Sequence, residues 1–276
     1  MKKPMKFLVA SVVAALLALV LGAGTAQAQL NAYVVNSGDN TLSVIDTATH
    51  TVTATIPVAG SPFSIAIDPA RFLAYVLTGS PGTVTVVDLP TNTVVAAIPV
   101  DANPFALALS ADRAFVYVTN AFSETVSVID TATNTVTNSV AVEFSHGAAL
   151  APDGSLWVSQ NSGDVSVIDT ATHTVTSTFS TGISWNDAAF TPDGAFAYLA
   201  ANGGTLIVDV ATRTVIASIE TDGVEIGLAV TPDGAFVYQP FAIFGLGGVA
   251  VIDTASFWPG HYRWTSPSLP TGPSPM

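Results

Sequence analysis

The residues that could carry out chemistry in this chain are few and mostly acidic. Its 276 residues include 20 Asp and Glu, seven Lys and Arg, four His and no Cys, for a formal net charge of −13. We expect no nucleic-acid binding, because neutralising phosphates takes basic residues. Without Cys there is no disulfide, no Cys-ligated metal site and no attached c-type haem. The sequence also lacks the GxSxG, HExxH and Walker motifs of common hydrolases and nucleotide-binding proteins.

One set of polar residues precedes short apolar segments at repeating positions. They lie in three segments at equivalent positions of successive repeats: Ser145-His146-Gly147, Trp185-Asn186-Asp187 and Glu225-Ile226-Gly227. An aromatic ring beside convergent polar groups is the usual composition of a ligand pocket. We therefore predict that five residues converge at one mouth of the central channel and bind a ligand there, with the indole of Trp185 as a stacking surface. These residues are His146, Trp185, Asn186, Asp187 and Glu225. The alternative is that they only line a wet channel.

The predicted ligand is a protein or a small cation, because the charge of the chain favours basic partners. We expect no cofactor and no dedicated metal site. Weak calcium binding near Asp187 and Glu225 is a further prediction, since oxygen ligands suit calcium better than zinc. The alternative is that the acidic residues only keep the protein soluble.

Six other acidic residues recur about 40 residues apart, each at the end of a VID-like segment. An Asp that ends a strand before a tight turn can accept hydrogen bonds from backbone N–H groups two or three residues later. We interpret them as structural turn acids: Asp46, Asp88, Asp130, Asp169, Asp209 and Asp253. His50 and His173 share a turn position filled elsewhere by Asn92, Asn134 and Arg213, which indicates a solvated site without catalysis.

These acids belong to a repeat that runs through the chain. SVIDTATHTVT occurs identically at residues 43–53 and 166–176, and aromatic residues keep the same period. Each unit predicts four short strands: an apolar one, an aromatic-bearing one, the VID strand, and an alternating Thr/Val strand. This indicates an all-β fold, a β-propeller of four-stranded antiparallel blades. Counting strands gives about six blades, the last of them incomplete.

The segment Tyr117-Val118-Thr119-Asn120, followed by ETVSVIDTATNTV, resembles the YVTN β-propeller repeat family of secreted and surface-layer proteins. The resemblance covers about residues 31–253. It implies a propeller fold and an extracytoplasmic location, and it implies little about activity.

Residues 1–28 have the order of a secretory signal peptide. Lys2, Lys3 and Lys6 precede an apolar run, and Ala26-Gln27-Ala28 forms a cleavage site. The alternative is an uncleaved membrane anchor, but the run is short for that purpose. We expect a secreted, periplasmic or cell-surface protein with no membrane insertion after cleavage, and a propeller domain over residues 29–255.

Residues 256–276 form a Pro-rich irregular tail, in which five prolines disfavour a regular strand. The tail is either a genuine flexible segment or the product of a truncated gene or shifted reading frame; the abrupt loss of pattern favours the second. An unclosed ring would leave strand edges open and permit oligomerisation through an open blade edge.

Together these features favour a secreted, non-enzymatic propeller that acts as a binding or cell-surface scaffold. The alternative is a hydrolase or lyase with its site at the mouth of the central channel, and the polar set at residues 146–225 is its support.

Overall fold

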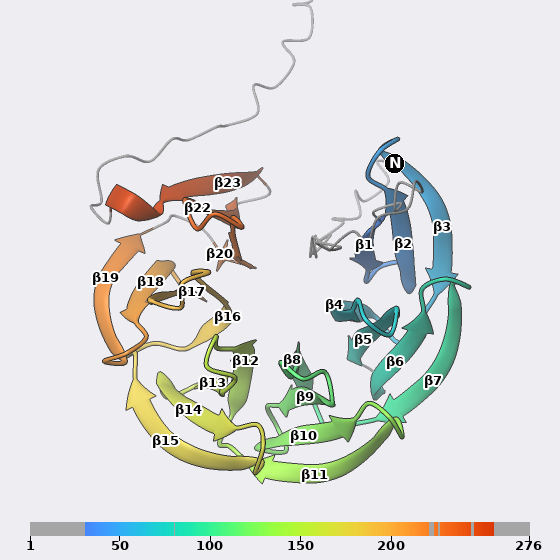
Figure 1. Cartoon of the computed structure of the whole chain (residues 1–276), viewed down its shortest axis with the longest axis horizontal. Helices are drawn as coiled ribbons and strands as arrows, with labels where there is room; N and C mark the ends of the chain where they lie inside the picture. The colour runs from blue at the N-terminus through green and yellow to red at the C-terminus, as the bar shows by residue number, and fades with distance from the viewer. Residues whose placement is uncertain (1–30, 80, 221–223, 226, 244–245, 257–276) are drawn as a thin grey trace, which may run out of the picture.

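The described strands form an arc of six β-sheets around a central channel, like blades of a propeller (Figure 1). The computed structural model describes residues 31–79, 81–220, 224–225, 227–243 and 246–256, with the backbone alone for 224–225, 241–243 and 246–248. The predicted signal peptide, and the predicted tail beyond Ser256, lie outside these residues. A short 3-10 helix, η1 (Thr254–Ser256), ends the described chain, and no helix within these ranges has the length and apolarity needed to span a membrane.

The first blade has three antiparallel strands: β1 (Asn31–Asn36), β2 (Thr41–Asp46) and β3 (Thr51–Pro57). They correspond to the second, third and fourth strands of the repeat. Short turns join them because Val, Thr and Ile favour extended backbone, whereas Ser37-Gly38-Asp39-Asn40 does not.

Four complete blades follow, each a four-stranded antiparallel meander in chain order from the channel outward. Their strands are β4 (Pro62–Asp68), β5 (Leu73–Gly79), β6 (Gly82–Asp88) and β7 (Thr93–Pro99); β8 (Pro104–Leu109), β9 (Phe115–Asn120), β10 (Thr125–Asp130) and β11 (Thr135–Ala141); β12 (Ser145–Leu150), β13 (Leu156–Gln160), β14 (Asp164–Asp169) and β15 (Thr174–Ser180); β16 (Trp185–Phe190), β17 (Phe196–Ala201), β18 (Gly204–Asp209) and β19 (Thr214–Glu220).

The sixth blade contains β20 (Val224–Glu225), β21 (Ala229–Val230), β22 (Phe236–Ile243) and β23 (Leu246–Asp253). β20 and β21 pair with the same edge of β22, because β23 occupies the other edge along its whole length. They are therefore two pieces of one interrupted inner strand, and no outer strand follows β23 within the described residues. The predicted propeller of about six blades with an incomplete last one is confirmed.

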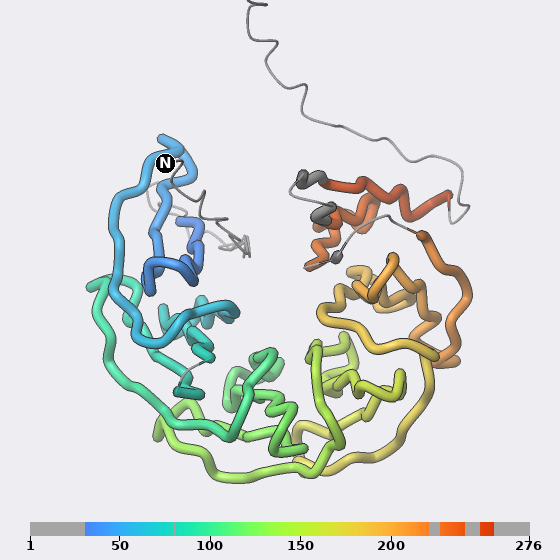
Figure 2. Tube along the Cα trace, turned by 180° about the vertical axis from the view of Figure 1, so that it is seen from behind, coloured from blue at the N-terminus to red at the C-terminus, as the bar shows by residue number. Residues whose placement is uncertain are grey.

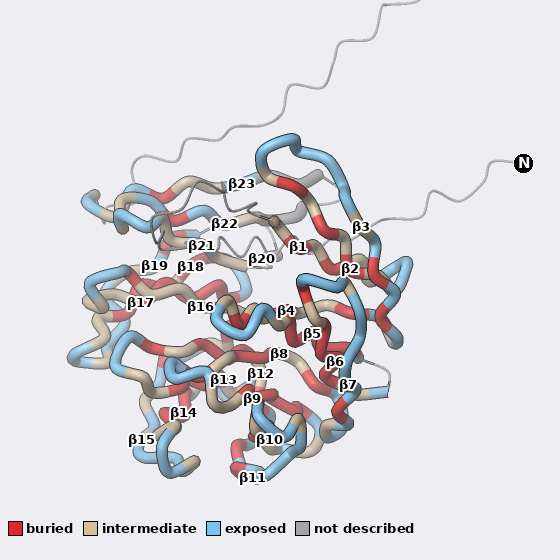
Figure 3. The backbone as a smooth tube through the Cα atoms, turned by 45° about the vertical axis from the view of Figure 1, so that its right-hand side comes forward, coloured by how far each residue is buried: buried red, intermediate tan, exposed pale blue. Residues whose placement is uncertain are grey.

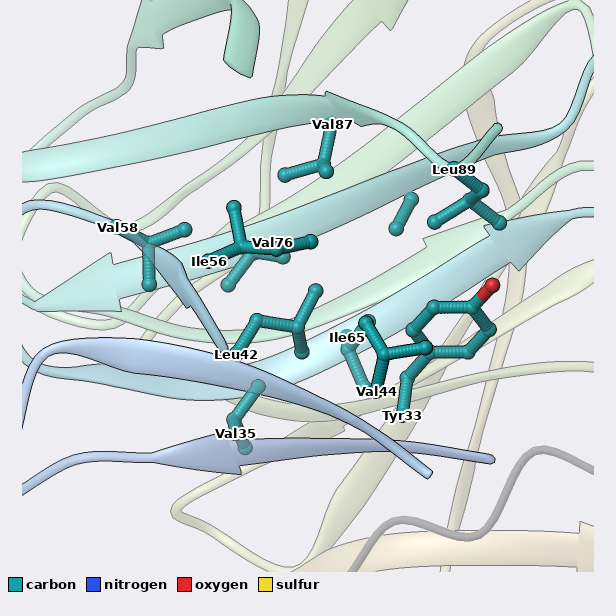
Figure 4. Packing of buried hydrophobic residues seen from close by; sticks show 11 residues of the cluster. Tyr33, Val35, Leu42, Val44, Ile56, Val58, Ile65, Val76, Val87 and Leu89 are labelled. Carbon is teal, nitrogen blue, oxygen red and sulfur yellow. The ribbon is translucent and has the colours of Figure 1, made fainter. Parts of the chain in front are cut away.

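The core lies between successive blades rather than in one central cluster. In Figure 4, Tyr33, Leu42 and Val44 of the first blade pack against Val76 and Val87 of the second. Each of the next four blade pairs forms an equivalent apolar cluster. Burying such a side chain contributes roughly 1.5–3 kcal/mol, so these interfaces are the main source of stability in a chain without disulfides.

The outer strands are mostly exposed, as the pale blue of β3, β7 and β15 shows (Figure 3). β3 has the sequence TVTATIP, and within it only Ile56 is buried. The alternation of Thr with apolar residues buries little of this strand, because Val52 is 59% exposed and only Ile56 packs in the cluster between the first two blades.

Candidate functional site

In each of the four complete blades, the innermost strand departs from regular pairing with the next strand at the same position of the repeat. The register shifts after Pro62 in β4, Pro104 in β8, Ser145 in β12 and Trp185 in β16. Such β-bulges re-aim side chains and are common beside functional sites. One residue at each bulge is half-buried and lies where the inner strand begins, at one mouth of the channel. We call these four residues the mouth arc: Phe63, Phe105, His146 and Asn186.

The mouth arc changes from apolar to polar along the chain. The rings of Phe105 and His146, on adjacent blades, have centroids 4.7 Å apart and are tilted by 42°. Burial lowers the pKa of His146 below its usual value, so the imidazole is neutral at pH 7 and has one donor and one acceptor nitrogen. The arc therefore offers aromatic surface, a neutral imidazole and an amide.

Hydroxyl groups from the neighbouring strands hold the bulges in place. Thr119 Oγ1 accepts a hydrogen bond from the Ala106 N–H at 3.0 Å and donates to the His146 carbonyl at 2.5 Å. Ser159 Oγ accepts one from the Trp185 N–H at 3.0 Å. Because Thr119 is buried and joins two blades, it fixes the spacing between Phe105 and His146.

Trp185 differs from its predicted role as a stacking surface. It is fully buried in the cluster between the fourth and fifth blades, and its indole Nε1 has no hydrogen-bond partner within the described residues. Asn186, the next residue, is only half-buried, so the bulge leaves the two side chains in different surroundings. Pro62, Pro104 and Ser145 occupy the same repeat position and are also buried.

Asp187 joins the fifth blade to the sixth. Its Oδ2 accepts a hydrogen bond from the Leu228 N–H and its Oδ1 from the Ala188 N–H, both at 2.9 Å. Burial outweighs these two bonds and raises the pKa of Asp187 to about 6. Leu228 lies between β20 and β21, where the inner strand is interrupted, so the carboxylate replaces a missing strand partner. Glu225 pairs through its backbone with Phe241, and its side chain lies outside the described part.

The five predicted binding residues are thus only partly brought together. His146 and Asn186 lie in the mouth arc, and Trp185 is buried beneath it. The carboxylate of Asp187 accepts its hydrogen bond from the Leu228 N–H instead. Phe63 and Phe105 belong to the arc but were not predicted as site residues. Their shared position, one residue after Pro62 and Pro104, was the available signal.

The six turn acids lie at the opposite ends of the blades from the mouth arc. Asp130 Oδ1, for example, accepts hydrogen bonds from the N–H groups of Ala132 at 2.9 Å and Thr133 at 2.8 Å. The other five Asp residues also accept hydrogen bonds from backbone N–H groups two or three residues later: Asp46 and Asp169 from both positions, Asp88 and Asp209 from the third residue, and Asp253 from the second. The fifth position of these turns is left-handed, with φ of 55° at His50 and 56° at His173.

Exposed carboxylates surround the mouth arc without forming a metal cage. Asp101, Glu124 and Glu143 lie in loops at the same ends of the blades as Phe105 and His146. In the part of the chain that the structure describes, no group of three or more His, Asp and Glu residues is placed to hold a metal ion. The rim is therefore a diffuse acidic field rather than a coordination site.

Comparison with known proteins places this arrangement in a family. A family model described as Domain of unknown function (DUF5074) matches residues 18–197. No curated protein matches the chain. Among the solved structures that match is "Kuenenia stuttgartiensis Hydrazine Synthase", at 23% identity and a TM-score of 0.73, covering 81% of this chain and 73% of that one. At this identity the likeness shows the fold alone. The comparisons support a β-propeller repeat protein without singling out the YVTN family.

Proposed function

The chain belongs to the family described as Domain of unknown function (DUF5074), and we propose that it is a secreted, non-enzymatic propeller that binds a small cationic ligand at its mouth arc. The observation that carries this proposal is the repeated bulge, which sets Phe63, Phe105, His146 and Asn186 at one mouth. The remaining repeat positions are occupied by core and turn residues, as a scaffold requires.

The chemistry of the arc suggests a cation with an apolar body. Phe63 and Phe105 provide aromatic surface, and the neutral imidazole of His146 can accept a hydrogen bond. Exposed Asp101 and Glu143 precede the two bulges in the chain and add negative potential around them. An ammonium group attached to an aromatic or alkyl body satisfies all three features, whether it belongs to a small molecule or to a Lys side chain of a protein.

Binding fits the site better than catalysis does. Asp187 has a pKa of about 6, which is in the range of a general acid–base group. Both of its oxygens, however, accept backbone hydrogen bonds, and the one from the Leu228 N–H joins two blades. This supports a structural role for Asp187 beside a site that binds without turnover. Weak calcium binding near Asp187 and Glu225 remains a prediction, and calcium titration of the wild type and Asp187→Asn tests it.

Export and a surface location are part of the proposal. The order of charged, apolar and small residues over 1–28 supports secretion, and the resemblance to YVTN repeats supports a periplasmic or cell-surface location. Intact-mass measurement of the exported protein tests this part, with Gln29 as the expected first residue.

The ligand is tested with benzylammonium as the probe and benzoate as its anionic counterpart. Isothermal titration should show millimolar binding of benzylammonium, about −4 kcal/mol, and none of benzoate. Phe105→Ala and His146→Ala should each weaken it at least about fivefold. Phe122→Ala is the matched control, because Phe122 is 77% exposed in a loop beside the arc but not part of it. Equal binding of benzoate, or an equal effect of Phe122→Ala, would contradict the proposal.

A further inference from the structure

The sixth blade has an apolar side that nothing in the described residues covers. We call the side of a blade that faces the next blade in the chain its leading face, and the opposite side its trailing face. In the first five blades the aromatic residue of the leading face is at most 6% exposed, whereas Tyr238 of the sixth is 43% exposed. Val249 is 40% exposed, whereas its equivalents in the first five blades, Leu42 among them, are 0% exposed. Phe236 on the same side is 40% exposed.

The first blade has the complementary defect on its trailing face. Val34 and Ile45 are only partly buried. At the position of Val34 the other five blades bury their side chains completely: Val76, Val118, Val158, Leu199 and Gln239. At the position of Ile45 they are also buried: Val87, Ile129, Ile168, Val208 and Ile252. The two uncovered faces lie at the two ends of the arc (Figure 2).

We propose that the leading face of the sixth blade in one copy of this chain binds the trailing face of the first blade in a second copy. Each of the five interfaces within the chain packs a leading face against a trailing face. In the second of them, Tyr75, Val84 and Val86 meet Val118 and Ile129. The sixth leading face carries the same kinds of residue, and the first blade carries the matching trailing face. A second copy therefore presents the surface that this face packs against throughout the fold.

The contact is head-to-tail, because the two faces differ. Because the second blade follows the first directly, docking in one plane would bring the second blade of one copy against the first blade of the other, so the second copy must be tilted and offset from the plane of the first, with the two faces overlapping in part. A head-to-tail contact with such an offset does not close after two copies and gives a series of growing oligomers. The net charge of −13 opposes association, so assembly should strengthen as salt screens this repulsion.

The test measures sedimentation of the full chain over concentration and salt. The wild type should associate at about 100 µM or below, more strongly at high salt. Tyr238→Asp, which blocks the leading face, and Val34→Asp, which blocks the trailing face, should each weaken association at least tenfold. An equimolar mixture of the two should form a complex of two chains and nothing larger, because each chain keeps the face that the other needs.

Controls separate this contact from other kinds of association. Val52→Asp and Ile216→Asp alter exposed apolar residues of outer strands and should associate like the wild type. Val249→Asp and Ile45→Asp provide a second complementing pair if either first variant fails to fold by circular dichroism. A monomeric wild type, a mixture that fails to form the two-chain complex, or a Val34→Asp variant that still associates fully would overturn the proposal. The proposal is also overturned if deletion of residues 257–276 is required for association, because the tail would then cover the face.

Discussion

Asp187 Oδ2 lies 2.9 Å from the backbone nitrogen of Leu228 on the next blade, so a carboxylate replaces the strand pairing that the interrupted inner strand lacks. Such a group makes stability depend on pH. Burial raises the folded-state pKa of Asp187 from its ordinary value to about 6, so the folded protein binds the proton more tightly than the unfolded chain. The stabilisation is complete below about pH 4 and is lost as pH rises through 6.

Asp187→Asn should therefore remove a pH dependence. Two pKa units correspond to about 3 kcal/mol, so the free energy of unfolding of the wild type should fall, relative to the variant, by up to that amount between pH 4 and 7. Other acids cancel in this difference, because both proteins contain them. Urea denaturation at several pH values measures the free energy of unfolding of both proteins. An identical pH dependence in the two would contradict the raised pKa of Asp187.

Tyr117→Phe should destabilise the protein by about 1 kcal/mol, because it removes a hydrogen bond between blades. The Tyr117 hydroxyl lies 2.9 Å from His173 Nδ1 and 3.1 Å from the Thr170 carbonyl on the next blade. Tyr198→Phe is the matched control, since the Tyr198 hydroxyl is buried without a partner in the described residues, and it should be neutral or slightly stabilising. Equal losses in thermal denaturation would count against the assigned contacts.

Gly147→Ala should cost about 1–3 kcal/mol through overpacking. A Cβ at this position would lie 2.7 Å from the Trp185 ring and 2.8 Å from the Asn186 carbonyl. Gly79→Ala is the comparison, because its Cβ would make only an ordinary contact at 3.4 Å with Phe63. If both variants denature at the same urea concentration, the fourth and fifth blades do not approach as closely as the structure indicates.

Asp46→Ala should lower stability by about 1 kcal/mol by removing the hydrogen bonds from the N–H groups of Ala48 and Thr49. Asp130→Ala and Asp169→Ala should change stability in the same direction, and all three should bind benzylammonium like the wild type. A loss of binding with unchanged stability in any of them would assign that Asp to a binding site instead.

The fold could be predicted because the sequence of each repeat determines its own strands and turns. Strand length, turn residues and alternation are visible within a single unit, such as residues 43–53, and the number of units gives the number of blades. The contacts of the six turn acids are also local, two or three residues along the chain.

The mouth was harder to predict because its geometry depends on neighbouring strands. A bulge is a property of two paired strands, so the exposure of Phe105 and the burial of Trp185 follow from a register that one segment does not reveal. The contact of Asp187 with Leu228 depends on an interrupted strand 41 residues away. The uncovered Tyr238 likewise repeats the local pattern of Tyr198 and differs only in what lies beside it.

The most direct test of binding at the mouth arc is an NMR titration of the imidazole signals with benzylammonium. The chain has four histidines, and the signal missing from a His146→Gln sample identifies His146. His50 and His173 lie in turns at the opposite ends of the blades. The account predicts saturable shifts of His146, with His50 and His173 unchanged. An unchanged His146 signal at saturating probe, or equal shifts of all three, would contradict it.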